Sequence, residues 1–376
     1  MKGKIRLSDK KIWLAKPHMS KEGFEQQYVQ EAFDTNWLAP LGPNVNHFEK
    51  EITEKVQVNH AAALVSGTAA IHLGLKALGV SDGDKVICPS FTFAATANAI
   101  TYLNAEPIFV DSEELTWNID PELLEKALEE QDIKAVIVVH LYGIAAQMDK
   151  IKDICKKYNV PILEDAAESL GSEYKGIPTG TIGDIGIYSF NGNKIITTSG
   201  GGMLVSNNQK IVDKIRFWST QSREQALHYE HKEVGYNYRM SNVVAGIGRG
   251  QLKILDRRVA QKKEIFKTYY EGLNDIDSIT FMPENDWDKP NYWLSCILLN
   301  SEKLQEKIIK VLKEHNIESR PLWKPMHLQP VYQGELSYIN GVAENLFKLG
   351  LCLPSDTNMD QDDLIKVISI IRKVAA

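Results

Sequence analysis

Residues 134–165, KAVIVVHLYGIAAQMDKIKDICKKYNVPILED, contain two apolar runs separated by a helical pattern. The runs at 134–140 and 160–165 are rich in Val and Ile, which favour strands, and residues 148–159 have the spacing of a helix. Apolar strands that alternate with helices are typical of a parallel sheet covered on both faces. We therefore expect an α/β fold with ligands at the carboxyl ends of its strands.

The same alternation extends in both directions from this stretch. It begins near residue 60 and gives way to one long helical segment from about Ser241, followed by a strand at YWLSCILL (292–299) and further helices. This change predicts two domains. Residues 1–250 would form a large ligand-binding domain with an N-terminal segment, and residues 251–376 a smaller α+β domain.

Composition limits the classes of function. The chain has 376 residues and a formal net charge of −6, so it lacks the basic surplus that nucleic-acid binding requires. No apolar run reaches the roughly 18 residues that span a bilayer, and the first residues are too charged for a signal peptide, so we expect a cytoplasmic protein. The cysteines are far apart and form no CxxC pair, which predicts free thiols and no metal site. They are Cys88, Cys155, Cys296 and Cys352.

Two early features lie where strands are expected to end. Ser66, Gly67 and Thr68 stand between a strand and a helix, where the free N–H groups of the helix N-terminus can hold a phosphate. Ser66 or Thr68 could equally be an ordinary helix cap. Phe91 and Phe93 follow the run KVIC, and either ring could stack on a flat cofactor or pack in the core.

Two later features add ionisable groups. Glu164 and Asp165 end the run VPILED, and Glu168 follows three residues later. A carboxylate there could pair with a cationic ring nitrogen, bind a metal or cap a helix, and the lack of a neighbouring His disfavours the metal. Ser189 could bind a phosphate, and Lys194 follows between two apolar runs, where a lysine could be a nucleophile, a phosphate ligand or a solvated charge.

This order of features suits pyridoxal phosphate. A lysine amine forms an imine with the cofactor aldehyde, and an acidic residue keeps the ring nitrogen protonated. The chain lacks GxxxxGK[ST], so a Walker-type nucleotide site is disfavoured, and no GxGxxG opens a helix after the first strand, so a nicotinamide site is not supported.

The combined motifs resemble the DegT/DnrJ/EryC1/StrS family of pyridoxal-phosphate-dependent nucleotide-sugar aminotransferases. The resemblance covers almost the whole chain. It implies the aspartate aminotransferase-like (type I) fold and a homodimer with active sites shared between subunits. The motifs that carry it, in chain order, are NWLAPLGP, SGTAAIHLGLKALGV, PSFTFAATANAI, HLYG, ILEDAAESLGS, SFNGNKIITTSGGGM, GYNYRMSN and RPLWKPMH.

The resemblance implies a role for each matching residue. Lys194 matches the lysine that holds the cofactor, and Asp165 matches the acid that pairs with the ring nitrogen. The remaining implied cofactor contacts are Gly67, Thr68 and Ser189 at the phosphate, Phe93 over the ring, Glu168 beside the ring, and Asn237 reaching the phosphate from the partner subunit.

Two positions depart from the wider family. Asn191 stands where His is common, and Ser199 stands where an acidic residue is common. This variant resembles a narrower subgroup that aminates UDP-2-acetamido-2,6-dideoxy-4-keto-hexose on the route to bacillosamine, together with similar exopolysaccharide enzymes. It implies transfer of an amino group from L-glutamate to C4 of a UDP-linked 4-keto-6-deoxy sugar. Amination at C3 and a dTDP nucleotide remain open.

A nucleotide diphosphate needs cationic contacts in this acidic chain. Each candidate could equally be solvated or held in a salt bridge, and Trp37 and Trp323 could stack on the substrate or pack against protein. The cationic candidates are Arg223, His231, Arg320, Lys324 and His327.

Three other functions remain as alternatives. A sugar dehydratase resembling this family would carry His at the lysine position, so Lys194 argues against it. A non-catalytic cofactor-binding protein is a second alternative. The third is an amino-acid aminotransferase or decarboxylase, in which a C-terminal arginine such as Arg320 would bind the substrate carboxylate.

Overall fold

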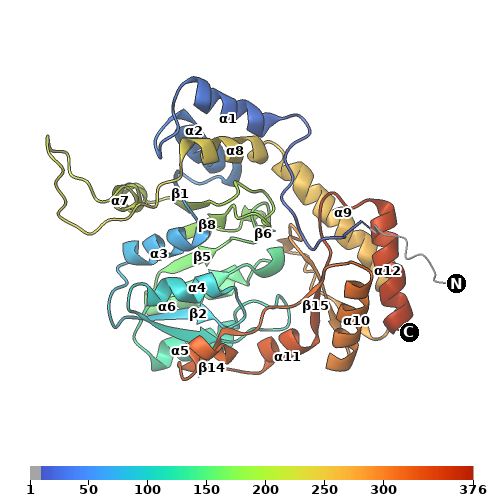
Figure 1. Cartoon of the computed structure of the whole chain (residues 1–376). Helices are drawn as coiled ribbons and strands as arrows, with labels where there is room; N and C mark the ends of the chain where they lie inside the picture. Colours follow the sequence, from blue (N-terminus) through green and yellow to red (C-terminus); the bar gives the residue numbers. More distant parts are fainter. Residues whose placement is uncertain (1–9, 376) are drawn as a thin grey trace.

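The computed structural model describes residues 10–375. Residues 1–9 and 376, which include the start of the charged N-terminal segment and the outer ends of both predicted domains, lie outside the described residues. Figure 1 shows a central sheet with helices around it and a second group of helices and strands at one side.

The central sheet carries the alternation seen in the sequence. Its strands are β1 (His60–Leu64), β2 (Lys85–Pro89), β3 (Glu106–Val110), β4 (Ile133–Val139), β5 (Ile162–Asp165), β8 (Ile185–Ser189), β9 (Gly202–Ser206) and β14 (Ser337–Tyr338). They lie in the order β1-β9-β8-β5-β4-β2-β3-β14. β9 runs antiparallel to β1 and β8 on either side of it, and the other neighbouring strands pair in parallel, so the predicted mainly parallel sheet is confirmed.

Helices cover both faces of this sheet. Because successive strand residues point to opposite faces, Ala135 and Ile137 of β4 pack on one side while Val136 and Val138 pack on the other. The first side lies against α3 (Gly67–Ala77), α4 (Ala94–Thr101) and α7 (Gln209–Ser219), and the second against α5 (Pro121–Glu130) and α6 (Met148–Tyr158). At the top of Figure 1, α1 (Phe24–Asp34) and α2 (Pro43–Val56) pack against α8 (Asn242–Leu252).

The second group contains a four-stranded antiparallel sheet in the order β10-β12-β15-β13. Its strands are β10 (Ile279–Phe281), β12 (Ser295–Leu299), β13 (Arg320–Pro321) and β15 (Gly350–Leu353). Its helices are α9 (Leu255–Leu273), α10 (Glu302–Glu314), α11 (Val342–Leu349) and α12 (Gln361–Ala375). A third sheet joins β6 (Glu173–Tyr174), β7 (Ile177–Pro178) and β11 (Asp288–Lys289). Short 3₁₀ turns are η1 (Leu141–Gly143), η2 (Met326–Leu328) and η3 (Pro330–Tyr332).

The predicted long helix from Ser241 is wrong in one respect. It consists of α8 and α9, separated at Lys253 and Ile254, where Ile254 leaves helical geometry with φ −110° and ψ 7°. The predicted division near residue 250 falls close to this break and stays a prediction. The strand β14 comes from the C-terminal part of the sequence, yet it extends the central sheet beside β3.

All four cysteines are buried free thiols, as predicted. Cys296 and Cys352 face each other across β12 and β15, with their Sγ atoms 3.8 Å apart. None of the helices within residues 10–375 is long and apolar enough to cross a membrane.

His72 on α3 is an ionisable group enclosed by aromatic rings. Its side chain is buried, and among the described residues neither ring nitrogen has a hydrogen-bond partner. The rings of Tyr102, Tyr236 and Tyr238 contact it edge-on. Burial, and secondly the charge of Lys76, lower the pKa of His72 from 6.5 to about 4. The folded protein therefore favours the neutral imidazole.

We expect His72 to make the fold sensitive to acid. Below pH 6.5 the unfolded chain gains a proton that folded His72 accepts only near pH 4, so stability falls as the pH decreases through this window. The His72→Phe variant lacks this loss. Denaturant midpoints of both proteins at pH 7.5 and 4.5 test this. A wild-type midpoint that falls no further than that of the variant would contradict it.

Candidate active site

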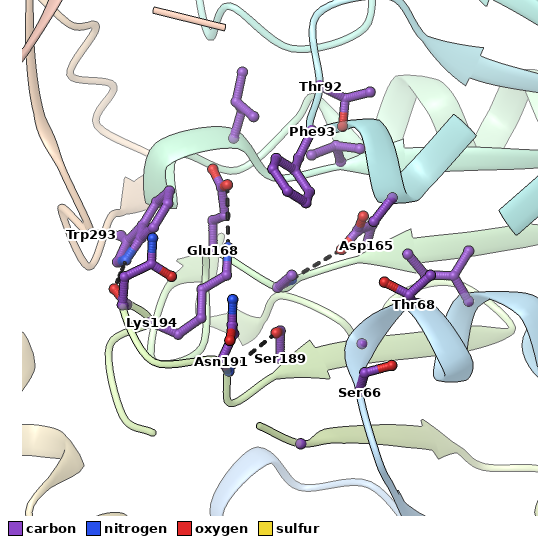
Figure 2. Close-up of a pocket in the computed structure, with 18 of the residues that line it drawn as sticks. Ser66, Thr68, Thr92, Phe93, Asp165, Glu168, Ser189, Asn191, Lys194 and Trp293 are labelled. Carbon is purple, nitrogen blue, oxygen red and sulfur yellow. Dashed lines mark hydrogen bonds and ion pairs between the residues drawn. The ribbon is translucent and has the colours of Figure 1, made fainter. Parts of the chain in front are cut away.

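A cavity of about 270 Å³ lies at the carboxyl ends of the central strands. Figure 2 shows the side chains that point into it from several elements of the large sheet and its helices. Ten residues singled out in the sequence line this cavity together: Ser66, Gly67, Thr68, Phe93, Asp165, Glu168, Ser189, Asn191, Lys194 and Trp323. The parallel sheet brings these residues together because its strand ends meet along one edge.

One end of the cavity is the N-terminus of α3. Ser66 is the cap of this helix, since its hydroxyl accepts a hydrogen bond from the Ala69 N–H at 3.0 Å. The N–H groups of Gly67 and Thr68 belong to the first turn and have no acceptor within the helix. A Cβ at Gly67 would lie 3.1 Å from the Ser189 Cβ, so glycine lets this serine approach the helix end. Together they form a cradle for an anion.

The neighbouring carboxylates of β5 have different functions because adjacent strand residues face opposite ways. Glu164 points away from the cavity, and its oxygens accept hydrogen bonds from the N–H groups of Gly180, Ile182 and Gly183 and contact the imidazole of His140. These distances are 2.8, 2.6, 2.5 and 2.8 Å, respectively. Glu164 therefore fixes the loop before β8.

Asp165 faces the cavity. It accepts hydrogen bonds from the Thr96 hydroxyl at 2.8 Å and from the Ala167 N–H at 3.2 Å. Burial raises its pKa, while the Thr96 hydrogen bond and the charge of Lys194 act in the opposite direction. A buried carboxylate of this kind gains most from a cationic partner that enters the cavity.

Lys194 stands in the turn after β8 and reaches into the same space, as Figure 2 shows. Its Nζ lies 3.3 Å from Oε1 of Glu168 and 4.1 Å from the centre of the Trp293 ring. The other Glu168 oxygen accepts the Tyr142 N–H at 2.9 Å. Burial raises the pKa of Glu168, and the Lys194 charge opposes this shift. An amine and a proton acceptor therefore lie side by side in the cavity.

Aromatic side chains complete the wall. Phe93 immediately precedes α4 and is 51 % exposed, unlike Phe91, which is buried in the core. Figure 2 places the Phe93 ring between Glu168 and Asp165, and its centroid lies 5.5 Å from that of Trp323. Trp293 also lines the cavity. Its position inside an apolar run predicted core packing, and it is buried in the core with its ring edge at the cavity.

The cationic residues predicted to bind substrate lie elsewhere in this single chain, whereas Trp323, which could stack on the substrate, lines the cavity. Asn237, Arg223 and His231 belong to the segment between α7 and α8, whose loop extends away from the body at the left of Figure 1. The five cationic candidates and Asn237 do not line the cavity of their own chain. They are Arg223, His231, Asn237, Arg320, Lys324 and His327.

Arg320 and His327 each contact a glutamate, as the alternative of a salt bridge predicted. Arg320 donates to Glu318 at 3.0 Å. The two ring nitrogens of His327 lie 2.6 Å from the Ser90 hydroxyl and 3.4 Å from Glu344. That these residues bind substrate stays a prediction.

The cavity residues fit pyridoxal phosphate on structural grounds. An anion cradle lies at Gly67, Thr68 and Ser189, and Asp165 is a buried carboxylate that forms no salt bridge within residues 10–375. The Lys194 amine lies 4.1 Å from the centre of the flat Trp293 ring. These groups match the phosphate, the ring nitrogen and the aldehyde of the cofactor.

Comparison with known proteins agrees with this chemistry. The model of the DegT/DnrJ/EryC1/StrS aminotransferase family matches residues 19–372. The chain belongs to this family. The resemblance seen in the motifs is therefore confirmed, as are the type I aminotransferase fold and the dependence on pyridoxal phosphate.

Three curated relatives align over nearly the whole chain. EpsN of Bacillus subtilis (strain 168), named as a candidate pyridoxal phosphate-dependent aminotransferase, is 53% identical over 96% of this chain and 95% of its own. The GDP-perosamine synthase of Escherichia coli O157:H7 is 36% identical over 93% and 95%. The UDP-4-amino-4,6-dideoxy-N-acetyl-beta-L-altrosamine transaminase of Campylobacter jejuni (strain 81-176) is 35% identical over 89% and 91%.

Solved structures give the same fold. The aminotransferase TlmJ of Streptoalloteichus hindustanus superposes with a TM-score of 0.90 at 27% identity, over 97% of this chain and 99% of its own. The PLP form of Spr1654 of Streptococcus pneumoniae, named as a candidate sugar aminotransferase, also has a TM-score of 0.90, at 25% identity over 97% and 99%. The chain is a sugar aminotransferase of this family.

Proposed function

We propose that this enzyme moves an amino group from L-glutamate to C4 of a UDP-linked 4-keto-6-deoxy sugar, such as UDP-2-acetamido-2,6-dideoxy-4-keto-hexose. One observation supports the aminotransferase chemistry: Lys194 and Asp165 line the same cavity, and the other end of that cavity is the anion cradle at the start of α3. The product would serve amino-sugar, glycan or polysaccharide biosynthesis.

The side chains divide the work of the proposed reaction. Pyridoxal phosphate supplies an aldehyde for amines and a ring that takes up electrons. Lys194 Nζ accepts the proton from the α-carbon of glutamate, which requires a neutral amine at that moment. The same amine then delivers a proton to the carbon of the cofactor that carried the aldehyde. Glu168 Oε1, 3.3 Å away, is placed to take the proton that the ammonium loses. Asp165 holds positive charge at the ring nitrogen.

The names of the relatives support a nucleotide-sugar substrate without choosing the nucleotide. One relative at 35% identity carries a UDP-linked product in its name, another at 36% carries a GDP-linked one, and EpsN at 53% names no substrate. The UDP choice therefore rests on the variant motifs around Asn191 and Ser199. A GDP-linked keto-sugar is the alternative that the names favour.

We also propose a homodimer whose active sites are shared. The arm that extends from the body exposes large apolar side chains at Leu227, Tyr229 and Val234, which a monomer leaves in water. Asn237 is exposed at the base of the same arm and is bridged to Thr220. A second copy would cover these side chains, and Asn237 and Arg223 of one subunit would then lie near the cavity of the other. The cytoplasmic location stays a prediction.

A substrate panel tests the proposed function. The purified holoenzyme is incubated with L-glutamate and, separately, UDP-, GDP- and dTDP-linked 4-keto-6-deoxy sugars and a 3-keto sugar, and the products are identified by NMR. We expect an amine at C4 of the UDP-linked sugar. Glutamate alone should bleach the visible absorbance of the holoenzyme, and the UDP-linked sugar should restore it.

The other outcomes identify the alternatives. Faster turnover of the GDP- or dTDP-linked sugar would replace the proposed nucleotide, and a deoxygenated product would indicate a dehydratase. Recovery of absorbance with 2-oxo acids other than 2-oxoglutarate would indicate an amino-acid aminotransferase. A holoenzyme that glutamate does not bleach would support the non-catalytic alternative.

A further inference from the structure

Residues 291–293, which lead into β12, form hydrogen bonds with both the turn that carries Glu168 and the turn that carries Lys194. The Asn291 side chain donates to the carbonyls of Glu168 and Leu170 at 3.0 and 2.9 Å. Its oxygen accepts the N–H of Trp293 at 2.8 Å. Residues 291–293 therefore bind the turn that carries Glu168 before the chain enters the small-domain sheet.

Trp293 makes two contacts with the Lys194 turn. Its indole N–H donates to the carbonyl of Asn193, the residue before Lys194, at 2.7 Å. Its ring centre lies 4.1 Å from Lys194 Nζ, within the range of a cation–π contact. Figure 2 shows the indole beside the start of the Lys194 side chain. One side chain thus fixes the backbone of the turn and one position of its amine.

Trp293 is itself fixed from the other side. The buried Lys262 of α9 donates to the Trp293 carbonyl at 2.9 Å and to the Ser355 carbonyl at 2.5 Å. Trp293 is also fully buried, with its ring stacked at 13° to that of Tyr142. A side chain held at its carbonyl, its N–H groups and its ring face has little freedom to move.

We propose that Trp293 is a positioning residue that aims Lys194, by anchoring the carbonyl of Asn193 and by receiving the lysine amine on its ring. The proposal rests on the proposed function, in which Lys194 moves the proton. A turn after a strand is otherwise free to shift, and displacements of about 1 Å at a reacting group can lower a rate by roughly a hundredfold.

The test separates positioning from packing. Trp293→Leu removes the N–H and all aromatic character, whereas Trp293→Phe removes the N–H and keeps a smaller aromatic ring. Trp287→Leu is the matched control, because the Trp287 indole nitrogen is buried without a hydrogen-bond partner among residues 10–375 and its side chain does not line the cavity. Each cofactor-free protein is treated with cyanate, and carbamylation of Lys194 is followed by peptide mass spectrometry.

We expect Lys194 to carbamylate about threefold faster or more in Trp293→Leu, because the ring no longer holds the ammonium. In the holoenzyme, Trp293→Leu and Trp293→Phe should lower kcat about tenfold or more while KM for glutamate stays within about twofold. Trp287→Leu should change neither quantity. Equal carbamylation of Lys194 in Trp293→Leu and wild type would overturn the proposal, even if kcat falls.

Two further measurements keep the test decisive. If Trp293→Leu does not fold, the wild-type chain labelled with 5-fluorotryptophan is compared with its Lys194→Ala form. A ¹⁹F resonance that moves supports the contact, and spectra without any such change overturn it. Turnover that persists in Lys194→Ala would instead defeat the proposed role of Lys194, so the failures of the two proposals are distinguishable.

Discussion

The Lys194→Ala enzyme should have no measurable turnover and no visible absorbance from a lysine-bound cofactor. Among the described residues, Lys194 is the only lysine that lines the cavity, so alanine removes the amine that attaches the cofactor and the group assigned to move the α-proton. The phosphate cradle at Gly67, Thr68 and Ser189 is untouched, so the variant should still bind pyridoxal phosphate non-covalently. Spectroscopy and a coupled glutamate assay measure both effects.

An exposed lysine provides the control for this result. Lys348→Ala removes an amine whose only ion pair in the described part of the chain is with Glu344 on the surface of α11. It should leave kcat, KM and the spectrum unchanged. Normal turnover in Lys194→Ala would show that another residue does the chemistry.

The Asp165→Asn enzyme should lose about a hundredfold to a thousandfold in kcat. Asparagine keeps the size of the side chain and an oxygen for the Thr96 hydroxyl, but it removes the negative charge at the buried cavity edge. The ring nitrogen then loses the partner that keeps it cationic, and the ring takes up electrons less well. Steady-state kinetics with saturating cofactor measure the effect.

The neighbouring Glu164 offers a matched control on the same strand. Glu164→Gln should weaken the hydrogen bonds to Gly180, Ile182 and Gly183, because part of the acceptor capacity becomes an NH₂ donor. We expect a lower melting temperature with kcat per folded molecule largely retained. If Glu164→Gln lost activity as Asp165→Asn does, the charge at Asp165 would not explain its effect.

The strand and helix pattern predicted the sheet because apolar runs and helical periodicity are local properties. Residues 134–165 became β4, α6 and β5, as expected. The break between α8 and α9 was missed because Lys253 and Ile254 contain neither Pro nor Gly. The addition of β14 to the central sheet was missed because a two-residue strand has no periodicity and its partner lies over 200 residues earlier.

In the site too, residues with a local sequence signal could be predicted, and residues placed by tertiary contacts could not. Asp165 and Ser189 could be predicted as cavity residues because each is a polar residue that ends a strand, and Lys194 because it follows in the turn after β8 between two apolar runs. The strand end alone left Glu164 and Asp165 open; the family resemblance selected Asp165, and the structure shows that Asp165 is the one that lines the cavity. Trp293 was missed because an apolar residue inside an apolar run looks like core packing, and only the tertiary structure places its indole against the Lys194 turn.

Peptide mapping of the reduced holoenzyme tests the central claim most directly. Borohydride makes the bond between a lysine amine and pyridoxal phosphate permanent, and mass spectrometry then locates the modified lysine. We predict a pyridoxyl phosphate group on Lys194, within the peptide that contains SFNGNK, at close to one group per chain. A modification on another lysine, or no modification of Lys194 in a protein that carries the cofactor, would contradict the account.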